Sequence, residues 1–224
     1  MQKAWIRHAL MVLLLGGLTW IFSVGRVQMH PVHRWNRAFA DAAFMMLCLT
    51  LAIGPASRFN RSIAKLLSWR RELGLGLTTA AVIHVLIYAS AFEWNFLRFV
   101  TQVEHNERIL LDNVFAAANW VGVIALGYLI VLALTSNNLS QRLLGKGWKF
   151  LQQQTYTVFI LAIVHAGLLA HLAYNQKETT FLPAFWIAAL GAGALQIAGY
   201  WKTVREQQRL RGVKSEVGQR LTRS

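Results

Sequence analysis

Six long apolar runs divide this sequence, and they constrain its fold more than any other feature. Each run approaches or exceeds the roughly 20 mostly apolar residues that a helix needs to cross a hydrocarbon core about 30 Å thick. Inside such a core every backbone N–H and C=O group must be paired within the segment, so these runs predict helices. They cover residues 8–24, 38–57, 72–92, 114–135, 154–174 and 181–201. We therefore predict an all-α, integral membrane six-helix bundle, with 1–224 as a single transmembrane domain that ends in a basic tail at 202–224.

The composition agrees with a membrane protein. Hydrophobic residues make up 55% of the chain and charged residues 14%, whereas an ordinary soluble domain has about 25% charged residues. The formal net charge of +14 comes from Lys and Arg residues in the connections and the tail. This distribution argues against a nucleic-acid-binding protein, which gathers its cations on one folded surface. Cys48 is the only cysteine, so an intrachain disulfide and a thiolate metal site are excluded.

The distribution of Lys and Arg predicts how the bundle is oriented. Most of the 23 Lys and Arg residues lie in the N-terminus, the second and fourth connections and the tail. The positive-inside rule then places both termini in the cytoplasm. Lys3 and Arg7 precede the first run as in a signal peptide, but residues 23–25 make a poor cleavage site. We therefore expect the first run to be a retained membrane anchor.

Two histidines lie deep inside apolar runs. His84 is set in "AAVIHVLIY" and His165 in "ILAIVHAGLL". His84 is 12 residues past Glu72, where its run begins, and His165 is 11 residues past Gln154. At about 1.5 Å of rise per residue, both lie roughly 17 Å from the inner boundary, on helices that run in the same direction. An ionisable side chain at this depth is costly and points to a functional site.

Two imidazoles at one depth can bind a planar cofactor between them. Haem iron takes axial nitrogen ligands on opposite faces, and an apolar pocket suits the macrocycle. Zinc needs about four ligands, and no Cys, Asp or Glu lies at that depth to complete the set. The alternative is that each histidine bonds a backbone carbonyl or a hydroxyl group of a neighbouring helix.

Three segments form a recognisable pattern: "RAFADAAFMMLCLTLAIGPASR" at 37–58, "RRELGL" at 70–75 followed by His84, and "TSNNLSQRLLGKGWKFLQQQTYTVFILAIVHAGLL" at 135–169. In their order and spacing they resemble the ferric-reductase-like transmembrane family. Within this family the chain is most similar to the haem-binding membrane subunits of the periplasmic methionine sulfoxide reductase system, the MsrQ/YedZ subgroup. The resemblance covers about residues 35–202, most of the chain.

The resemblance implies a cofactor, a location and partners. It implies b-type haem with His84 and His165 as iron ligands, in a multi-pass protein of the bacterial inner (plasma) membrane. Electrons would pass from a cytoplasmic flavin reductase or the quinone pool to a periplasmic reductase subunit. The chain would then be the electron-transfer membrane subunit of an oxidoreductase, in contact with membrane lipid and without catalytic residues of its own.

One position departs from the family pattern. The family's other histidine on the fifth helix falls on Gln152, and glutamine is a poor ligand for haem iron, so an inner haem is in doubt. The expected inner relay is then a bound flavin such as FMN, a quinone, or haem held by an unusual ligand. Arg70 and Arg71 suit a phosphate or propionate, and Gln152 suits a flavin or quinone carbonyl. The alternatives are orienting charges for the arginines and a polar helix start for the glutamine.

Two other functions stay open from the residues alone. The bundle could be a multi-span transporter or an assembly protein whose histidines bind a metal or a proton transiently. It could also be a degenerate family member that kept the fold without electron transfer, and Gln152 is the best support for that alternative. His171 is a further candidate ligand, but it lies six residues past His165 and so faces another side of the helix.

Overall fold

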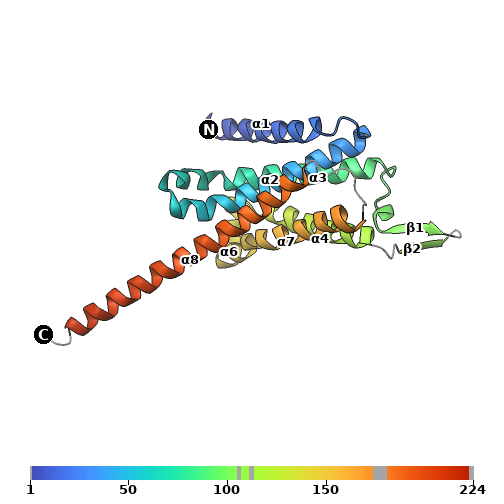
Figure 1. Cartoon of the computed structure of the whole chain (residues 1–224). Helices are drawn as coiled ribbons and strands as arrows, with labels where there is room; N and C mark the ends of the chain where they lie inside the picture. Colours follow the sequence, from blue (N-terminus) through green and yellow to red (C-terminus); the bar gives the residue numbers. More distant parts are fainter. Residues whose placement is uncertain (1, 105–106, 111–113, 174–180, 222–224) are drawn as a thin grey trace.

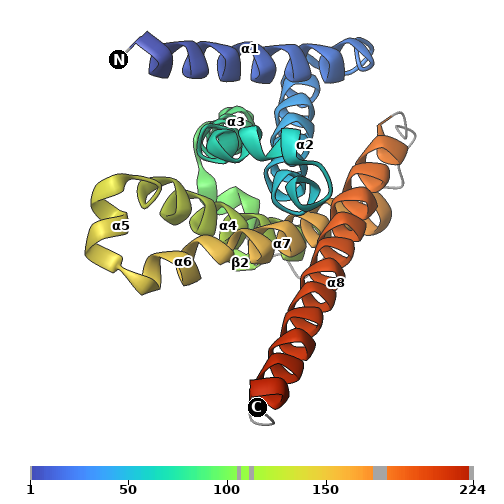
Figure 2. The same ribbon diagram turned by 90° about the vertical axis from the view of Figure 1, so that its left-hand side faces the viewer.

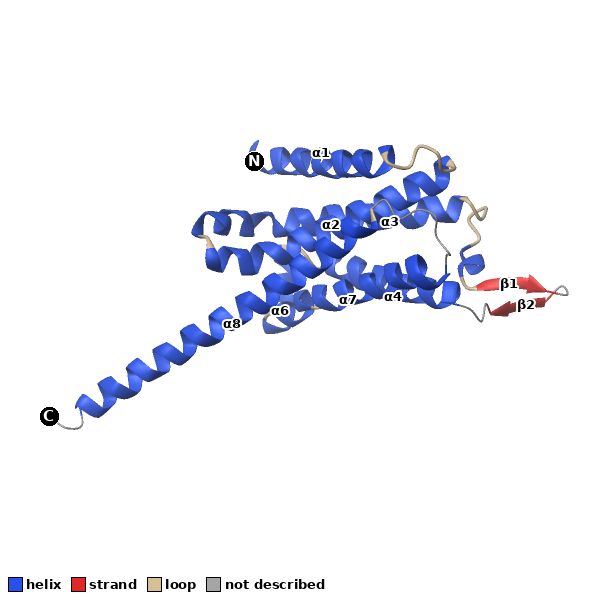
Figure 3. Cartoon of the chain, viewed as in Figure 1, coloured by secondary structure: helices blue, strands red, loops and turns tan. Residues whose placement is uncertain are grey.

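The structure is a computed structural model that describes residues 2–104, 107–110, 114–173 and 181–221. Among these residues, six helical segments are long and apolar enough to cross a membrane. They are Trp5–Val24, Pro31–Phe59, Arg61–Ser90, Val114–Leu134, Lys146–Ala170 and Leu182–Arg211. The predicted all-α, six-helix membrane bundle is therefore confirmed, and helices dominate every view (Figure 3). The orientation of the termini stays a prediction.

The secondary structure elements follow the apolar runs closely. The long helices are α1 (Gln2–Val24), α2 (Pro31–Phe59), α3 (Arg70–Ser90), α4 (Val114–Leu134), α7 (Thr155–Gly167) and α8 (Leu182–Leu221). Shorter helical segments lead into or follow them: η1 (Arg61–Trp69), η2 (Phe96–Phe99), α5 (Asn138–Leu144), α6 (Lys146–Gln153) and the π-helical η3 (Leu168–Ala173). Pro31 begins α2, where its missing N–H has no intrahelical partner to lose.

Two features of the structure were not expected from the apolar runs. An antiparallel hairpin of β1 (Thr101–Glu104) and β2 (Glu107–Leu110) projects from one end of the bundle (Figure 1). Helix α8 continues without a break to Leu221 and extends beyond the bundle at the other end (Figure 1). The basic tail predicted at 202–224 is thus helical as far as it is described.

Helix α2 occupies the centre of the bundle. It packs against α1, α3 and α8, while α4 packs against α3 and α7. Seen along the bundle, α1 crosses one side and α8 the other (Figure 2). Helix α8 approaches α2 closely at Gly199 of α8. A Cβ atom added there would lie only 2.6 Å from Cβ of Pro55 on α2. Glycine at this position therefore lets the two helix backbones approach each other.

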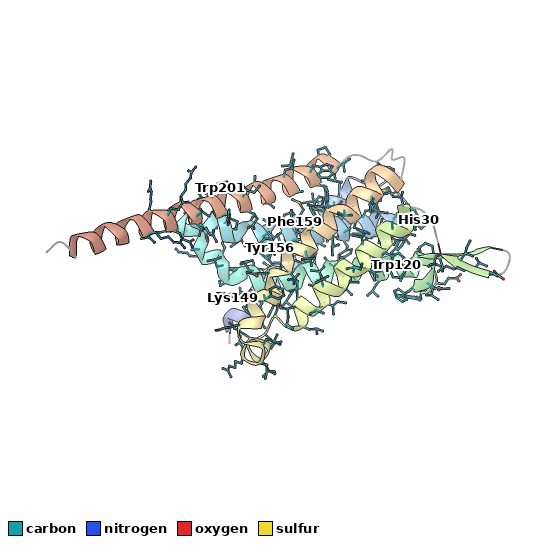
Figure 4. The ribbon with its side chains drawn as sticks, turned by 90° about the horizontal axis from the view of Figure 1, so that it is seen from below. His30, Trp120, Lys149, Tyr156, Phe159 and Trp201 are labelled. Carbon is teal, nitrogen blue, oxygen red and sulfur yellow. The ribbon has the colours of Figure 1, made fainter. Side chains whose placement is uncertain are left out.

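The two ends of the bundle differ in packing. We call the end with the hairpin the outer end and the opposite end, predicted to face the cytoplasm, the inner end; Figure 4 places His30 and Trp120 toward the outer end and Lys149 toward the inner end. The inner half contains one aliphatic cluster from α2, α3, α4 and α7: Met46, Leu47, Leu51, Ile53, Leu73, Leu77, Leu129, Leu132 and Val158.

Candidate cofactor site

His84 and His165 line the same cavity in the outer half of the bundle. Its volume is about 410 Å³, within the range of about 300–1,000 Å³ typical of small-molecule and cofactor pockets. Helices α2, α3, α4, α7 and α8 all contribute to its walls, together with η3 and the connection between α1 and α2. Much of the lining is apolar or aromatic, including Met29, Phe115, Leu169, Phe181, Phe185 and Trp186.

Asn36 on α2 holds His84 on α3 through two hydrogen bonds. The His84 Nδ1 atom lies 3.0 Å from the backbone oxygen of Asn36, and the Asn36 side-chain Nδ2 donates to the backbone oxygen of His84 over 2.8 Å. A carbonyl oxygen only accepts, so Nδ1 of His84 carries the proton. The Nε2 atom is then the nitrogen with a lone pair for a ligand.

His165 on α7 is held in a similar way, by a backbone oxygen of α4. Its Nδ1 atom lies 2.7 Å from the backbone oxygen of Ala118. One turn further along α4, a Cβ at Gly122 would lie 2.8 Å from both Cε1 and Nδ1 of the His165 ring. The absence of a side chain at Gly122 thus makes room for the imidazole. The π-helical segment η3 begins three residues after His165, and such segments are frequent at functional sites.

The geometry fits a metal-bound cofactor. Imidazoles that bind a metal through one nitrogen usually donate the other N–H to a carbonyl or carboxylate, which sets the tautomer and the ring orientation. His84 and His165 both have this bond. The backbone contacts weighed as an alternative from the sequence are therefore present, yet they leave each Nε2 available. Two such imidazoles that line one partly apolar cavity would be able to hold haem iron, which takes nitrogen ligands of this kind.

The other residues singled out in the sequence lie at the inner end. Arg70 donates from Nε to the backbone oxygen of Thr50 over 3.1 Å, and Arg71 is exposed. Gln152 Nε2 lies 3.4 Å from Oγ1 of Thr135 and 3.5 Å from the backbone oxygen of Leu132. Within the described residues, none of Arg70, Arg71 and Gln152 lines the cavity. The side chain of His171 lies outside the described residues.

Several cavity residues did not stand out in the sequence. Arg26, Arg37 and Asp41 all line the cavity, although none of them was a candidate site residue in the sequence. Arg26 is only 5% exposed, and its Nη1 lies 2.6 Å from Oδ2 of Asp41. The sequence does contain a pattern that could have identified this polar face of α2. His33, Arg37 and Asp41 are spaced by four residues and so share one helix face.

Loss of the Asn36 side chain should weaken the packing of α2 against α3, because it removes the hydrogen bond from Asn36 to the backbone oxygen of His84. We expect Asn36→Ala to lower the free energy of unfolding by about 1 kcal/mol, the usual net value of one hydrogen bond. Denaturant-induced unfolding of the purified protein in detergent measures the change. Asn138→Ala, at an exposed position on α5, is the matched control and should have no measurable effect. Equal effects of the two variants would contradict a specific role for Asn36.

Comparison with known proteins places the chain in a family. Residues 37–163 match the family described as "Ferric reductase like transmembrane component". The chain is 35% identical over 144 residues to magnetosome protein MamZ of Paramagnetospirillum magneticum, covering 63% of this chain and 20% of MamZ. It is 30% identical over 168 residues to the protein-methionine-sulfoxide reductase heme-binding subunit MsrQ of Salmonella arizonae, covering 73% of this chain and 79% of MsrQ.

The extent of these matches matters for what they imply. The chain spans about a fifth of the length of the magnetosome relatives, whereas it covers most of MsrQ. The family match begins at Arg37, includes His84 and ends two residues before His165. More than half of the chain therefore lies within the match, as the resemblance found in the sequence predicted. On this basis the chain belongs to the ferric reductase-like transmembrane family.

Proposed function

We propose that the chain is a membrane haem protein that passes single electrons across a bacterial inner membrane. The observation that carries the proposal is the cavity that His84 and His165 share, with Nδ1 of each imidazole bonded to a backbone carbonyl. The similarity to MsrQ, a heme-binding subunit that is 30% identical to the chain, supports b-type haem as the cofactor. When bound, the haem supplies the one-electron chemistry.

The residues of the chain bind and orient the cofactor. The carbonyls of Asn36 and Ala118 hold both rings in the tautomer that leaves Nε2 free for iron. Phe115, Phe185 and Trp186 supply aromatic walls that exclude water. His84 lies six residues before the outer end of α3 at Ser90, which is about 9 Å along the helix. This depth favours electron exit on the outer side, to a periplasmic oxidoreductase subunit.

Electron entry on the inner side needs a second carrier. His84 is 14 residues from the inner end of α3 at Arg70, or about 21 Å along the helix. We propose FMN or a quinone as the inner relay, reduced by a cytoplasmic flavin reductase or drawn from the quinone pool. Arg70 and Arg71, both exposed at the inner end, are the proposed partners of the FMN phosphate, because a guanidinium suits an oxyanion. Gln152 is the proposed partner of a flavin or quinone carbonyl.

The packing supports one haem per chain. The inner half contains the aliphatic cluster described above, in which Leu51 and Val158 are each 1% exposed. The side-chain nitrogen of Gln152 lies near the end of α4, 3.5 Å from the backbone oxygen of Leu132 and 3.4 Å from Oγ1 of Thr135 at that end. A second macrocycle at this level would have to displace several packed side chains, at a cost of about 2–5 kcal/mol for each large aliphatic side chain that leaves the core.

Spectroscopy of the purified full chain tests the proposal. A reduced-minus-oxidised spectrum should show the Soret and α bands of b-type haem, and haem quantitation should give about one haem per chain. Electrons from a reduced flavin should convert the oxidised haem spectrum to the reduced one, in detergent or in liposomes. A well-folded protein that remains colourless after expression with ample haem would overturn the proposal and favour a transporter or an assembly protein.

Restoring a histidine at position 152 should not create a second haem site. We expect Gln152→His to keep the stoichiometry at about one haem per chain, because the inner half of the bundle contains the packed aliphatic cluster that includes Leu73, Leu77 and Val158. Haem quantitation against protein concentration measures this. The conservative control is Gln153→His on the same short helix. Two haems per chain in the Gln152 variant alone would contradict the single-haem proposal and indicate a vacant inner site.

A further inference from the structure

We propose that a pocket between the end of α2 and the inner part of α8 binds the phosphate group of an anionic phospholipid. The pocket has a volume of about 630 Å³ and lies apart from the cavity that His84 and His165 share. Its walls are Phe59 of α2 and six residues of α8 between Ala198 and Arg209. The inference does not depend on haem, so it succeeds or fails separately from the proposed function.

Contacts between α2 and α8 hold the walls of the pocket in place. Nη1 of Arg58 donates to the backbone oxygen of Gly199 over 2.7 Å and also to Oγ1 of Thr203. Nζ of Lys202 donates to the backbone oxygen of Arg58 and lies 5.0 Å from the centroid of the Phe59 ring. The fold therefore forms this pocket without a ligand, which lowers the entropic cost of binding one.

The pocket lies where α8 leaves the hydrocarbon core. Helix α8 begins at Leu182 near the outer end, and at about 1.5 Å per residue it reaches Lys202 after about 30 Å, the thickness of the core. Trp201 lies toward the inner end of the bundle (Figure 4). Trp201 and Phe59 are both exposed, as is usual for aromatic side chains at a membrane interface. The pocket is thus level with the headgroups of the leaflet at the inner end.

Arg205 and Arg209 supply positive charge for a phosphate. Among the described residues, neither arginine has an ion-pair or hydrogen-bond partner. With Lys202 and Glu206 the lining has three cations and one carboxylate, a net charge of +2. A guanidinium binds phosphate oxygens through two parallel hydrogen bonds. The Cα–Cβ bonds of a helix tilt toward its N-terminus, so both side chains start back toward the membrane.

One face of α8 changes from apolar to basic at this pocket. Ile187, Leu190 and Ile197 are exposed, and their spacing places them on the same helix face as Trp201. Arg205 follows Trp201 by four residues and continues that face. An apolar stripe suits acyl chains, and the cations beyond it suit an anionic headgroup. This combination favours a phospholipid over a soluble phosphate compound, as for other basic pockets between membrane helices on the cytoplasmic side.

Lipid titration followed by native mass spectrometry tests the proposal. The full chain in detergent is titrated with dioleoyl phosphatidylglycerol, which is anionic, and with dioleoyl phosphatidylcholine, which is zwitterionic. We expect tighter binding of phosphatidylglycerol. The double variant Arg205→Gln with Arg209→Gln should lose about 25-fold in affinity for it, about fivefold for each cation near the headgroup. Its affinity for phosphatidylcholine and its elution as a monodisperse species should not change.

Arg211→Gln is the matched control. Arg211 is exposed on the same helix, but it lies two residues past Arg209, faces another side and is not among the residues that line the pocket. Its variant should bind phosphatidylglycerol as the wild type does. Equal binding of both lipids to the wild type would overturn the inference, as would an unchanged affinity in the double variant or an equal loss in the control.

A competition experiment separates a lipid from a soluble phosphate compound. Glycerophosphoglycerol is the headgroup of phosphatidylglycerol without its acyl chains. We expect it to displace the lipid only at far higher concentration, because it cannot use the apolar stripe of α8. Displacement at the concentration at which the lipid itself binds would overturn the assignment to a phospholipid and make the pocket a site for soluble phosphate compounds.

Discussion

Replacing His84 or His165 with alanine abolishes the b-type haem spectrum of the purified protein: this is the largest effect that the structure leads us to expect. Each substitution removes one of the two imidazoles that share the cavity, together with its bond to a backbone carbonyl. Loss of an outer-shell partner alone reduces metal affinity roughly 10- to 100-fold, and loss of the ligand itself should cost more. Haem quantitation and the reduced-minus-oxidised spectrum measure the result.

His30→Ala is the matched control for the histidine variants. His30 is exposed next to the start of α2 and lies toward the outer end of the bundle (Figure 4). Its removal should leave haem content and spectrum unchanged. All variants should elute as the same monodisperse species, so that loss of haem is separated from loss of fold. Full haem content in both His84→Ala and His165→Ala would exclude these residues as ligands.

Gly122→Ala should have the second-largest effect, although residue 122 offers no side chain to any cofactor. The added Cβ would lie 2.8 Å from Cε1 and Nδ1 of His165 and 3.4 Å from its Nε2. The ring cannot move away freely, because Nδ1 is bonded to the oxygen of Ala118 at 2.7 Å. Either this bond or the ring orientation must change. We therefore expect haem affinity to fall roughly 10- to 100-fold, as for other residues that orient a metal ligand.

Gly127→Ala separates this steric effect from the general effect of glycine replacement. Gly127 lies on the same helix, and a Cβ there would meet no atom within 4 Å. Alanine also has the higher helix propensity, by about 1 kcal/mol, so both variants gain the same intrinsic stabilisation. Haem titration and the electron paramagnetic resonance spectrum of the oxidised iron should change only in Gly122→Ala. Identical behaviour of the two variants would mean that His165 does not need the space at Gly122.

Much of the architecture was predictable because it depends on local properties of the sequence. The length of an apolar run and the need to pair every backbone group inside a membrane are sufficient to predict six helices. The depth of His84 and His165 follows from counting residues along two of these helices at a constant rise. The family match at 37–163 agrees with the resemblance found in the same segments. The ends were less predictable: α8 continues past residue 202 to Leu221.

The sequence by itself determined the membrane bundle and the two histidines at one depth, because hydrophobic length and helical rise act within each segment. Only the tertiary structure decided what surrounds those histidines. The bonds of His84 to Asn36 and of His165 to Ala118 join residues 48 and 47 positions apart, and the pairing of Arg26 with Asp41 joins two different elements. Such contacts depend on how helices rotate and pack against one another, and side-chain volume at positions such as Gly122 sets that packing.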